Sequence, residues 1–149
     1  MATEKRWTAY DSIQTYFSTE LDSLADDARA LGDLIDFTAT GTDQKIYMDI
    51  ELYLAQIDLT SQHNPSVYIW VLRKFPGSTT EDGWTNASPA RSPEVIIPLR
   101  TVNYANRAIS SLVLTTPHQG RILLQNKSGV TWASSGNTLK YSIYSLQDV

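Results

Sequence analysis

The sequence predicts an all-β protein, an antiparallel β-sandwich of the jelly-roll-like kind with an extended or partly helical N-terminal arm. Three observations predict this class. Residues 45–58 alternate aliphatic with polar or aromatic side chains, which is the two-residue period of a strand. Further segments rich in β-branched and aromatic residues follow at short intervals, separated by turn-forming residues. No helical segment intervenes between them, as is typical of sandwiches.

The individual strands follow from the same patterns. Pro98 interrupts one of them, and because proline cannot donate to a ladder, we expect that strand at a sheet edge or a bulge. Two others flank a Pro-His-Gln-Gly turn at 117–120 and are expected to pair as a hairpin. The expected strands are 45–58, 67–74, 94–100, 109–115, 121–126, 130–133 and 138–146.

The N-terminal third has a weaker pattern. Residues 16–34 contain helix formers with a thin apolar stripe, which predicts a short helical turn within an arm. We therefore expect an arm and lead-in segment over 1–43 and a β-sandwich over 44–149, within one compact domain. The irregular stretch 75–93 is longer than most loops and carries Trp84, so we expect it to be a contact loop.

Composition narrows the classes of function. The chain has 149 residues, a formal charge of −4 and no cysteine, which excludes thiolate metal sites and thiol catalysis. Lysine and arginine are scattered, so we expect no nucleic-acid partner. We expect no membrane partner either, because no apolar run approaches the roughly 20 residues of a spanning helix. Met1 to Arg6 precede no apolar stretch, so no secretory signal is expected.

Residues able to do chemistry are sparse. His63 and His118 each lie beside a turn proline without a metal-binding spacing. Asp49 and Glu51 share one strand face, where adjacent carboxylates usually keep the face solvated, whereas glycoside hydrolysis needs them opposed across a substrate. We expect no enzyme, no cofactor and no metal.

Aromatic residues are the better candidates for function. Trp and Tyr are frequent hot spots of protein interfaces. The arm carries Trp7, Tyr10, Tyr16 and Phe17, and the long loop carries Trp84; we expect these to contact another protein. Deleting residues 1–17 is then expected to abolish that contact and to leave the fold intact.

Four segments resemble small virion proteins of tailed phages. The run 120–140 is similar to the C-terminal end of those proteins, and 18–25 is similar to their N-terminal segment. Residues 47–55 and 98–100 also look like theirs. The resemblance touches most of the chain in order. The long loop and an aspartate-rich arm depart from it.

The resemblance implies a head decoration (cement) protein with a jelly-roll-like fold. Its partners would be the major capsid protein and further copies of itself, as a homotrimer, and its place would be the outer surface of the phage head after assembly in the host cytoplasm. It offers no catalytic residue. A tail or fibre component and a carbohydrate-binding β-sandwich module are the alternatives, and the latter requires two or three exposed coplanar aromatic rings.

Overall fold

A computed structural model describes residues 5–7, 11–37, 47–74, 89–114 and 119–148 of the chain. These residues form an all-β structure whose one helical element is a single 3-10 turn, η1, at Thr19–Leu21. Across the described ranges, no helix is long and apolar enough to cross a membrane.

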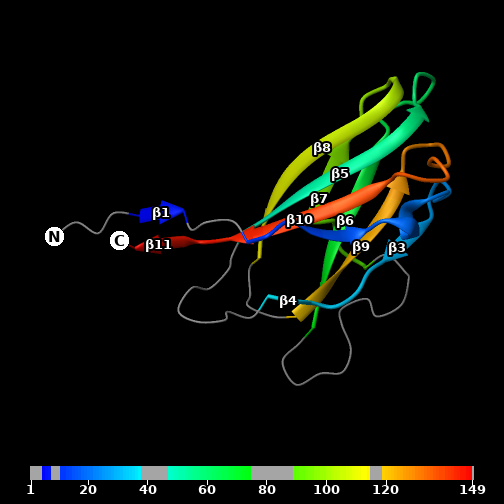
Figure 1. The fold of residues 1–149 in the computed structure, drawn as a ribbon. Helices are drawn as coiled ribbons and strands as arrows, with labels where there is room; N and C mark the ends of the chain where they lie inside the picture. Colours follow the sequence, from blue (N-terminus) through cyan, green and yellow to red (C-terminus); the bar gives the residue numbers. More distant parts are fainter. Residues whose placement is uncertain (1–4, 8–10, 38–46, 75–88, 115–118, 149) are drawn as a thin grey trace.

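Two antiparallel sheets form the sandwich, and the first and last strands form a separate ribbon (Figure 1). In chain order they are β1 Lys5–Trp7, β2 Gln14–Phe17, β3 Arg29–Leu31, β4 Ile35–Asp36, β5 Tyr47–Asp58, β6 Ser66–Arg73, β7 Val95–Pro98, β8 Asn103–Val113, β9 Gln119–Lys127, β10 Thr138–Tyr144 and β11 Leu146–Asp148.

The strand order is that of a jelly roll. One sheet, called here the β5 sheet, has the order β2-β10-β5-β8, and the other, the β6 sheet, has the order β3-β9-β6-β7 with β4 also on β9. The pairs are nested, since β6 pairs with β7, β5 with β8, β3 with β9 and β2 with β10. A long antiparallel ribbon rolled into two sheets gives this nesting. The sequence-based prediction of an antiparallel, jelly-roll-like sandwich is confirmed.

The termini continue the nesting. β1 pairs with β11 in a separate two-stranded ribbon, the terminal ribbon, with Arg6 opposite Gln147 and Trp7 opposite Leu146. Figure 1 shows this ribbon projecting from one end of the sandwich. An isolated two-stranded ribbon is marginally stable in water. The terminal ribbon therefore depends on what it packs against.

The core lies between the two sheets and follows from strand alternation. On β5, Met48, Ile50, Leu52 and Leu54 are buried, while the residues between them point outward. Opposite them, β6 and β9 are buried on both faces, because Trp70, Leu72 and Leu123 form a second apolar cluster on the outer side of the β6 sheet. Continuous apolar runs are expected for strands covered on both faces.

A buried polar network holds the end of the sandwich away from the termini, where the loop after β9 meets the loop after η1 (Figure 1). The Asn126 side chain donates to the carbonyls of Leu24 and Val130, and the Asn137 side chain donates to the carbonyl of Ala133. The two loops also share backbone bonds, including Ser23 N to Ala133 O at 2.9 Å. This loop-end network consists of Asn126, Ser128, Trp132 and Asn137.

Three sequence-based expectations on strands need correction. β8 and β9 do not form a hairpin, because β8 pairs with β5 and β9 pairs with β6, so the chain crosses between sheets here. Residues 117–118 of the expected turn lie outside the described residues. Residues 130–133 are irregular and belong to the loop-end network. The expected last strand, 138–146, divides into β10 and β11, which belong to different sheets.

The N-terminal segment is built into both sheets and contains the expected short helical turn. Much of 16–34 is extended, with η1 as its one helical turn. β2 pairs with β10 in the β5 sheet, while β3 and β4 pair with β9 in the β6 sheet. The described part of the expected 1–43 arm therefore contributes edge strands to both sheets. The thin apolar stripe reflects this, since Leu21 and Leu24 cover the core from a loop.

Candidate interaction surfaces

The outer face of the β5 sheet is an open surface with exposed apolar side chains. Register places its outward side chains in cross-strand rows, because directly opposed residues share a face. These rows mix apolar, polar and charged groups, and Ile109 and Val113 are more than half exposed. The rows are Tyr144–Tyr47–Val113, Ser142–Asp49–Ser111, Lys140–Glu51–Ile109 and Thr138–Tyr53–Arg107.

A shallow groove of about 490 Å³ crosses this face. Ile13 and Ile109 stand at the groove with exposed fractions of 72% and 67%. Glu51, Lys140 and the neighbouring polar side chains line it as well. The groove is therefore open and mainly apolar, with a few charged side chains at its walls.

The outward carboxylates Asp49 and Glu51 of β5 have structural partners. Asp49 Oδ1 accepts hydrogen bonds from the Ser111 hydroxyl and, at 3.1 Å, from the Tyr144 hydroxyl. Glu51 forms an ion pair with Arg107 of β8. Both carboxylates face outward from neighbouring rows, as the alternation of β5 predicted. Their cross-strand partners were not predicted, since the sequence suggested only that they keep the face solvated.

An aromatic cluster lies where the terminal ribbon joins the sandwich. Trp7 contacts Tyr47 and Tyr144 edge to face, with ring centroids 5.3 and 5.5 Å apart and interplanar angles of 73° and 66°. Tyr47 and Tyr144 stack on each other. Trp7 nevertheless stays 60% exposed. It is therefore anchored on the outer face and still open to a partner.

The structure separates the expected contact residues. Trp7 is exposed and agrees with a contact role, whereas Tyr10 and Trp84 lie outside the described residues. Phe17 is a correction: it is fully buried in the core, so it is not available to a partner. Deleting residues 1–17 would remove this core side chain together with β2, so the deletion cannot leave the fold intact.

Tyr16 is also structural. Its hydroxyl donates to the Asp33 carbonyl and accepts from Ile122 N–H at 2.9 Å. This bond takes the place of a ladder bond where the edge strand is broken between β3 and β4. Gly32 is required there, because a Cβ would lie 2.2 Å from the Tyr16 ring. Burial raises the pKa of the Tyr16 hydroxyl.

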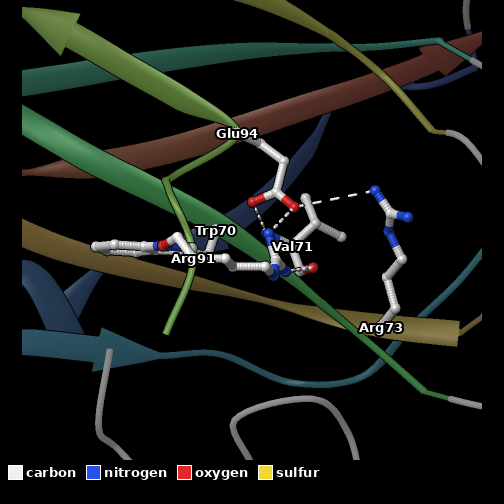
Figure 2. A network of polar contacts seen from close by, with 5 residues as sticks. All are labelled: Trp70, Val71, Arg73, Arg91 and Glu94. Carbon is white, nitrogen blue, oxygen red and sulfur yellow. Dashed lines mark hydrogen bonds and ion pairs between the residues drawn. The ribbon is translucent and has the colours of Figure 1, made fainter. Parts of the chain in front are cut away.

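A second polar group closes the outer edge of β6 beyond β7 (Figure 2). The Glu94 carboxylate accepts from Val71 N–H at 3.0 Å, and the Arg91 guanidinium donates to the Val71 carbonyl at 2.9 Å. Arg91 and Glu94 also form an ion pair, and the Trp70 indole donates to the Arg91 carbonyl. The sequence analysis did not predict that Arg91 and Glu94 cap the backbone of β6. The signal for it was the pair of opposite charges just before the edge strand β7.

The described ranges also bear on the expectation about metal binding. No group of three or more histidine, aspartate or glutamate side chains is placed to hold a metal ion there. His63 is exposed in a turn, and His118 lies outside the described residues.

No protein-family model matches the chain, and no curated protein matches it. Among the solved structures that match, the three that follow share 11 to 13% sequence identity with the chain. The structure of Cocksfoot mottle virus is 11% identical, covers 95% of this chain and 94% of its own, and has a TM-score of 0.38. The EclA C-terminal domain, a sugar-binding protein, is 12% identical, with coverages of 100% and 79% and a TM-score of 0.30.

The enzymatically active domain of tailspike protein 4 from Bacteriophage CBA120 is 13% identical with a TM-score of 0.37. The match covers 97% of the protein described here and 19% of the tailspike chain. We therefore infer the function from the residues of the chain itself.

Proposed function

We propose that the chain is a structural protein of a tailed-phage particle, and within the particle a decoration protein on the outer surface of the head. The observation that carries the proposal is the outer face of the β5 sheet. It presents exposed apolar side chains in rows, while its carboxylates are already engaged with neighbouring strands. A surface of this kind binds proteins and performs no chemistry of its own.

The contact with the head would use this face and the aromatic cluster beside it. Trp7 is held by Tyr47 and Tyr144, so its ring loses little conformational freedom on binding. Ile13 lies further along the same face at the groove. Many copies on one particle would multiply a modest affinity per contact.

The carbohydrate alternative predicts a flat platform of coplanar rings. Trp7 stands at a steep angle to both tyrosines, and the tyrosines cover each other's faces. The aromatic cluster in the described part of the chain therefore lacks the geometry that stacking on a sugar requires. This favours a protein partner.

Cosedimentation tests the proposal. Purified chain is mixed with heads of its own phage that lack it, and with tails of the same phage. Saturable binding to heads is expected, and Ile13→Lys should weaken it by about tenfold or more, because a charge replaces an apolar contact. Ile96→Lys is the matched control, since Ile96 is 55% exposed on the other sheet.

The proposal fails if the wild-type chain ignores heads while it binds tails or a glycan array. Equal weakening by Ile13→Lys and Ile96→Lys would show that the outer face of the β5 sheet is not the contact surface.

A further inference from the structure

Three of the four sheet edges in the described structure are closed against a further strand. β2 has four residues, and its pairing with β10 shifts register between Leu139 and Lys140. The β3–β4 edge is broken, and the Tyr16 hydroxyl occupies the break. β7 has four residues and ends at Pro98, beyond which Arg91 and Glu94 cap β6. Short strands, bulges, proline and inserted side chains are the usual protection of an edge.

β8 lacks these protections from Asn106 to Val113, because the register shift in its pairing with β5 lies outside that stretch, between Leu54 and Ile57. It has eleven residues, and those from Asn106 to Val113 pair with β5 from Leu54 to Tyr47 in unbroken register. No described strand pairs with its other side. It contains no proline, glycine or lysine, and its one charged residue, Arg107, is held by Glu51 of β5. A long, uncharged edge with exposed apolar residues is a template for another strand.

We propose that β8 pairs antiparallel with β8 of a second copy of this chain, about a two-fold axis at Ile109. The pairing would join two β5 sheets into one continuous sheet, with about eight backbone hydrogen bonds across the junction. It stands apart from the phage assignment, because it rests on the edge strand alone.

The sequence of β8 is complementary to itself in this register. Ile109, which is 67% exposed, would meet its own copy, and Val113, which is 55% exposed, would meet Ala105 of the second copy. Burying these exposed apolar groups favours association. A two-fold interface requires this kind of self-complementary patch.

Charges also fit this register. Arg107 would face Ser111 of the second copy, whose hydroxyl is bonded to Asp49 of the next strand. That carboxylate would then lie two strand spacings away, or about 10 Å between backbones, within reach of an arginine side chain. The row therefore places opposite charges side by side, and no like charges on β8 oppose each other.

Cysteine cross-linking tests the axis directly, because the chain has no cysteine of its own. In the full chain, Ile109→Cys should give a disulfide-linked dimer on mild oxidation, since directly opposed residues of an antiparallel pair have Cα atoms about 4.5–5.5 Å apart. Ile96→Cys is the matched control: it should still associate through β8 but should give no disulfide-linked dimer, because Ile96 lies on β7. A mixture of Arg107→Cys and Ser111→Cys should cross-link, and neither alone should.

Sedimentation of the variants without cysteine gives the second readout. The wild-type chain should show a concentration-dependent dimer, and Ile109→Lys should weaken dimerisation by about tenfold or more, because two ammonium groups would meet at the axis. Ile96→Lys should dimerise as wild type does. A wild-type chain that stays monomeric at about 100 µM would overturn the proposal. So would an oligomer, including the homotrimer that the resemblance implies, in which the thiol introduced by Ile109→Cys stays reduced. Failure to bind phage heads would leave the dimer standing.

Discussion

The two ends of the sandwich are held in different ways. At the loop end, Asn126 is fully buried and satisfies two carbonyls, while Trp132 and Asn137 close the same network from the following turn. At the other end, β1 and β11 pair over three residues each, and the contact to the sandwich is made by Trp7, which is 60% exposed. One end is buried and polar, and the other is aromatic and open.

This contrast separates the residues that stabilise the fold from the residues that are exposed to a partner. The segments 18–25 and 120–140, which carry the resemblance to phage virion proteins, meet at the loop end through Asn126, Asn137 and their backbone bonds. Their physical task is to hold two loops together. The residues open to a partner lie elsewhere, on the terminal ribbon and the outer face of the β5 sheet. The likeness in these two segments therefore bears on the fold more directly than on a binding partner.

The largest effect is expected from Asn126→Ala. The change removes two hydrogen bonds to carbonyls and the acceptor of the Ser128 N–H and hydroxyl, all in a fully buried position. Buried groups left without partners cost about 1–3 kcal/mol each, partly offset by relaxation, so the free energy of unfolding should fall by about 3–4 kcal/mol. Urea denaturation measures it.

Asn103→Ala is the control for this substitution. Asn103 is exposed at the start of β8, and its replacement should change the free energy of unfolding by less than about 0.5 kcal/mol. A loss below about 1 kcal/mol for Asn126→Ala would show that the loop-end network is not what holds this end.

A smaller effect is expected from Tyr16→Phe, which tests the join between the two sheet edges. Ile122 N–H loses its acceptor, so the free energy of unfolding should fall by about 1–2 kcal/mol at neutral pH. Burial raises the pKa of this hydroxyl in the folded state, while the pKa of an unfolded tyrosine is about 10. Below pH about 10 the Tyr16 hydroxyl keeps its proton in both the folded and the unfolded state, so its contribution to the free energy of unfolding is complete.

Above that pH the unfolded state loses the proton first, so the contribution falls as pH rises. The difference in stability between wild type and Tyr16→Phe should therefore narrow from pH 9 to pH 11, as followed by denaturant titrations. Tyr53→Phe, on the exposed outer face, should change stability by less than about 0.5 kcal/mol. A gap between wild type and Tyr16→Phe that widens with pH would contradict the assigned role.

The sequence predicted the strands whose pattern is local. The alternation around Met48 and Ile50 identified β5 and its buried face, and Pro98 identified an edge strand. Pairing between distant segments was not predictable in this way. The sequence predicted β9 as half of a hairpin, because a turn precedes it. Its apolar residues on both faces, such as Leu123 and Leu124, instead fit a central strand that is covered on two sides.

The candidate surface was predicted in part. Trp7 was expected to be exposed, and it is. Phe17 was placed beside it by sequence position, but strand pairing turns Phe17 into the core. Ile13 and Ile109 were missed, because an exposed aliphatic residue on a strand has the same local pattern as a buried one. Their exposure follows from which sheet face is covered, and only the packing of the two sheets decides that.

The smallest effect on stability is expected at the open end. Trp7→Ala removes two edge-to-face contacts, but the ring is already 60% exposed, so the free energy of unfolding should fall by about 1 kcal/mol or less. Hydrogen exchange of the amides in β1 and β11 should accelerate, because a two-stranded ribbon is marginal without its packing. Trp7→Phe should keep much of the protection. A loss of about 3 kcal/mol would mean that the terminal ribbon is part of the folding core, and the contrast between a structural end and an open end would no longer hold.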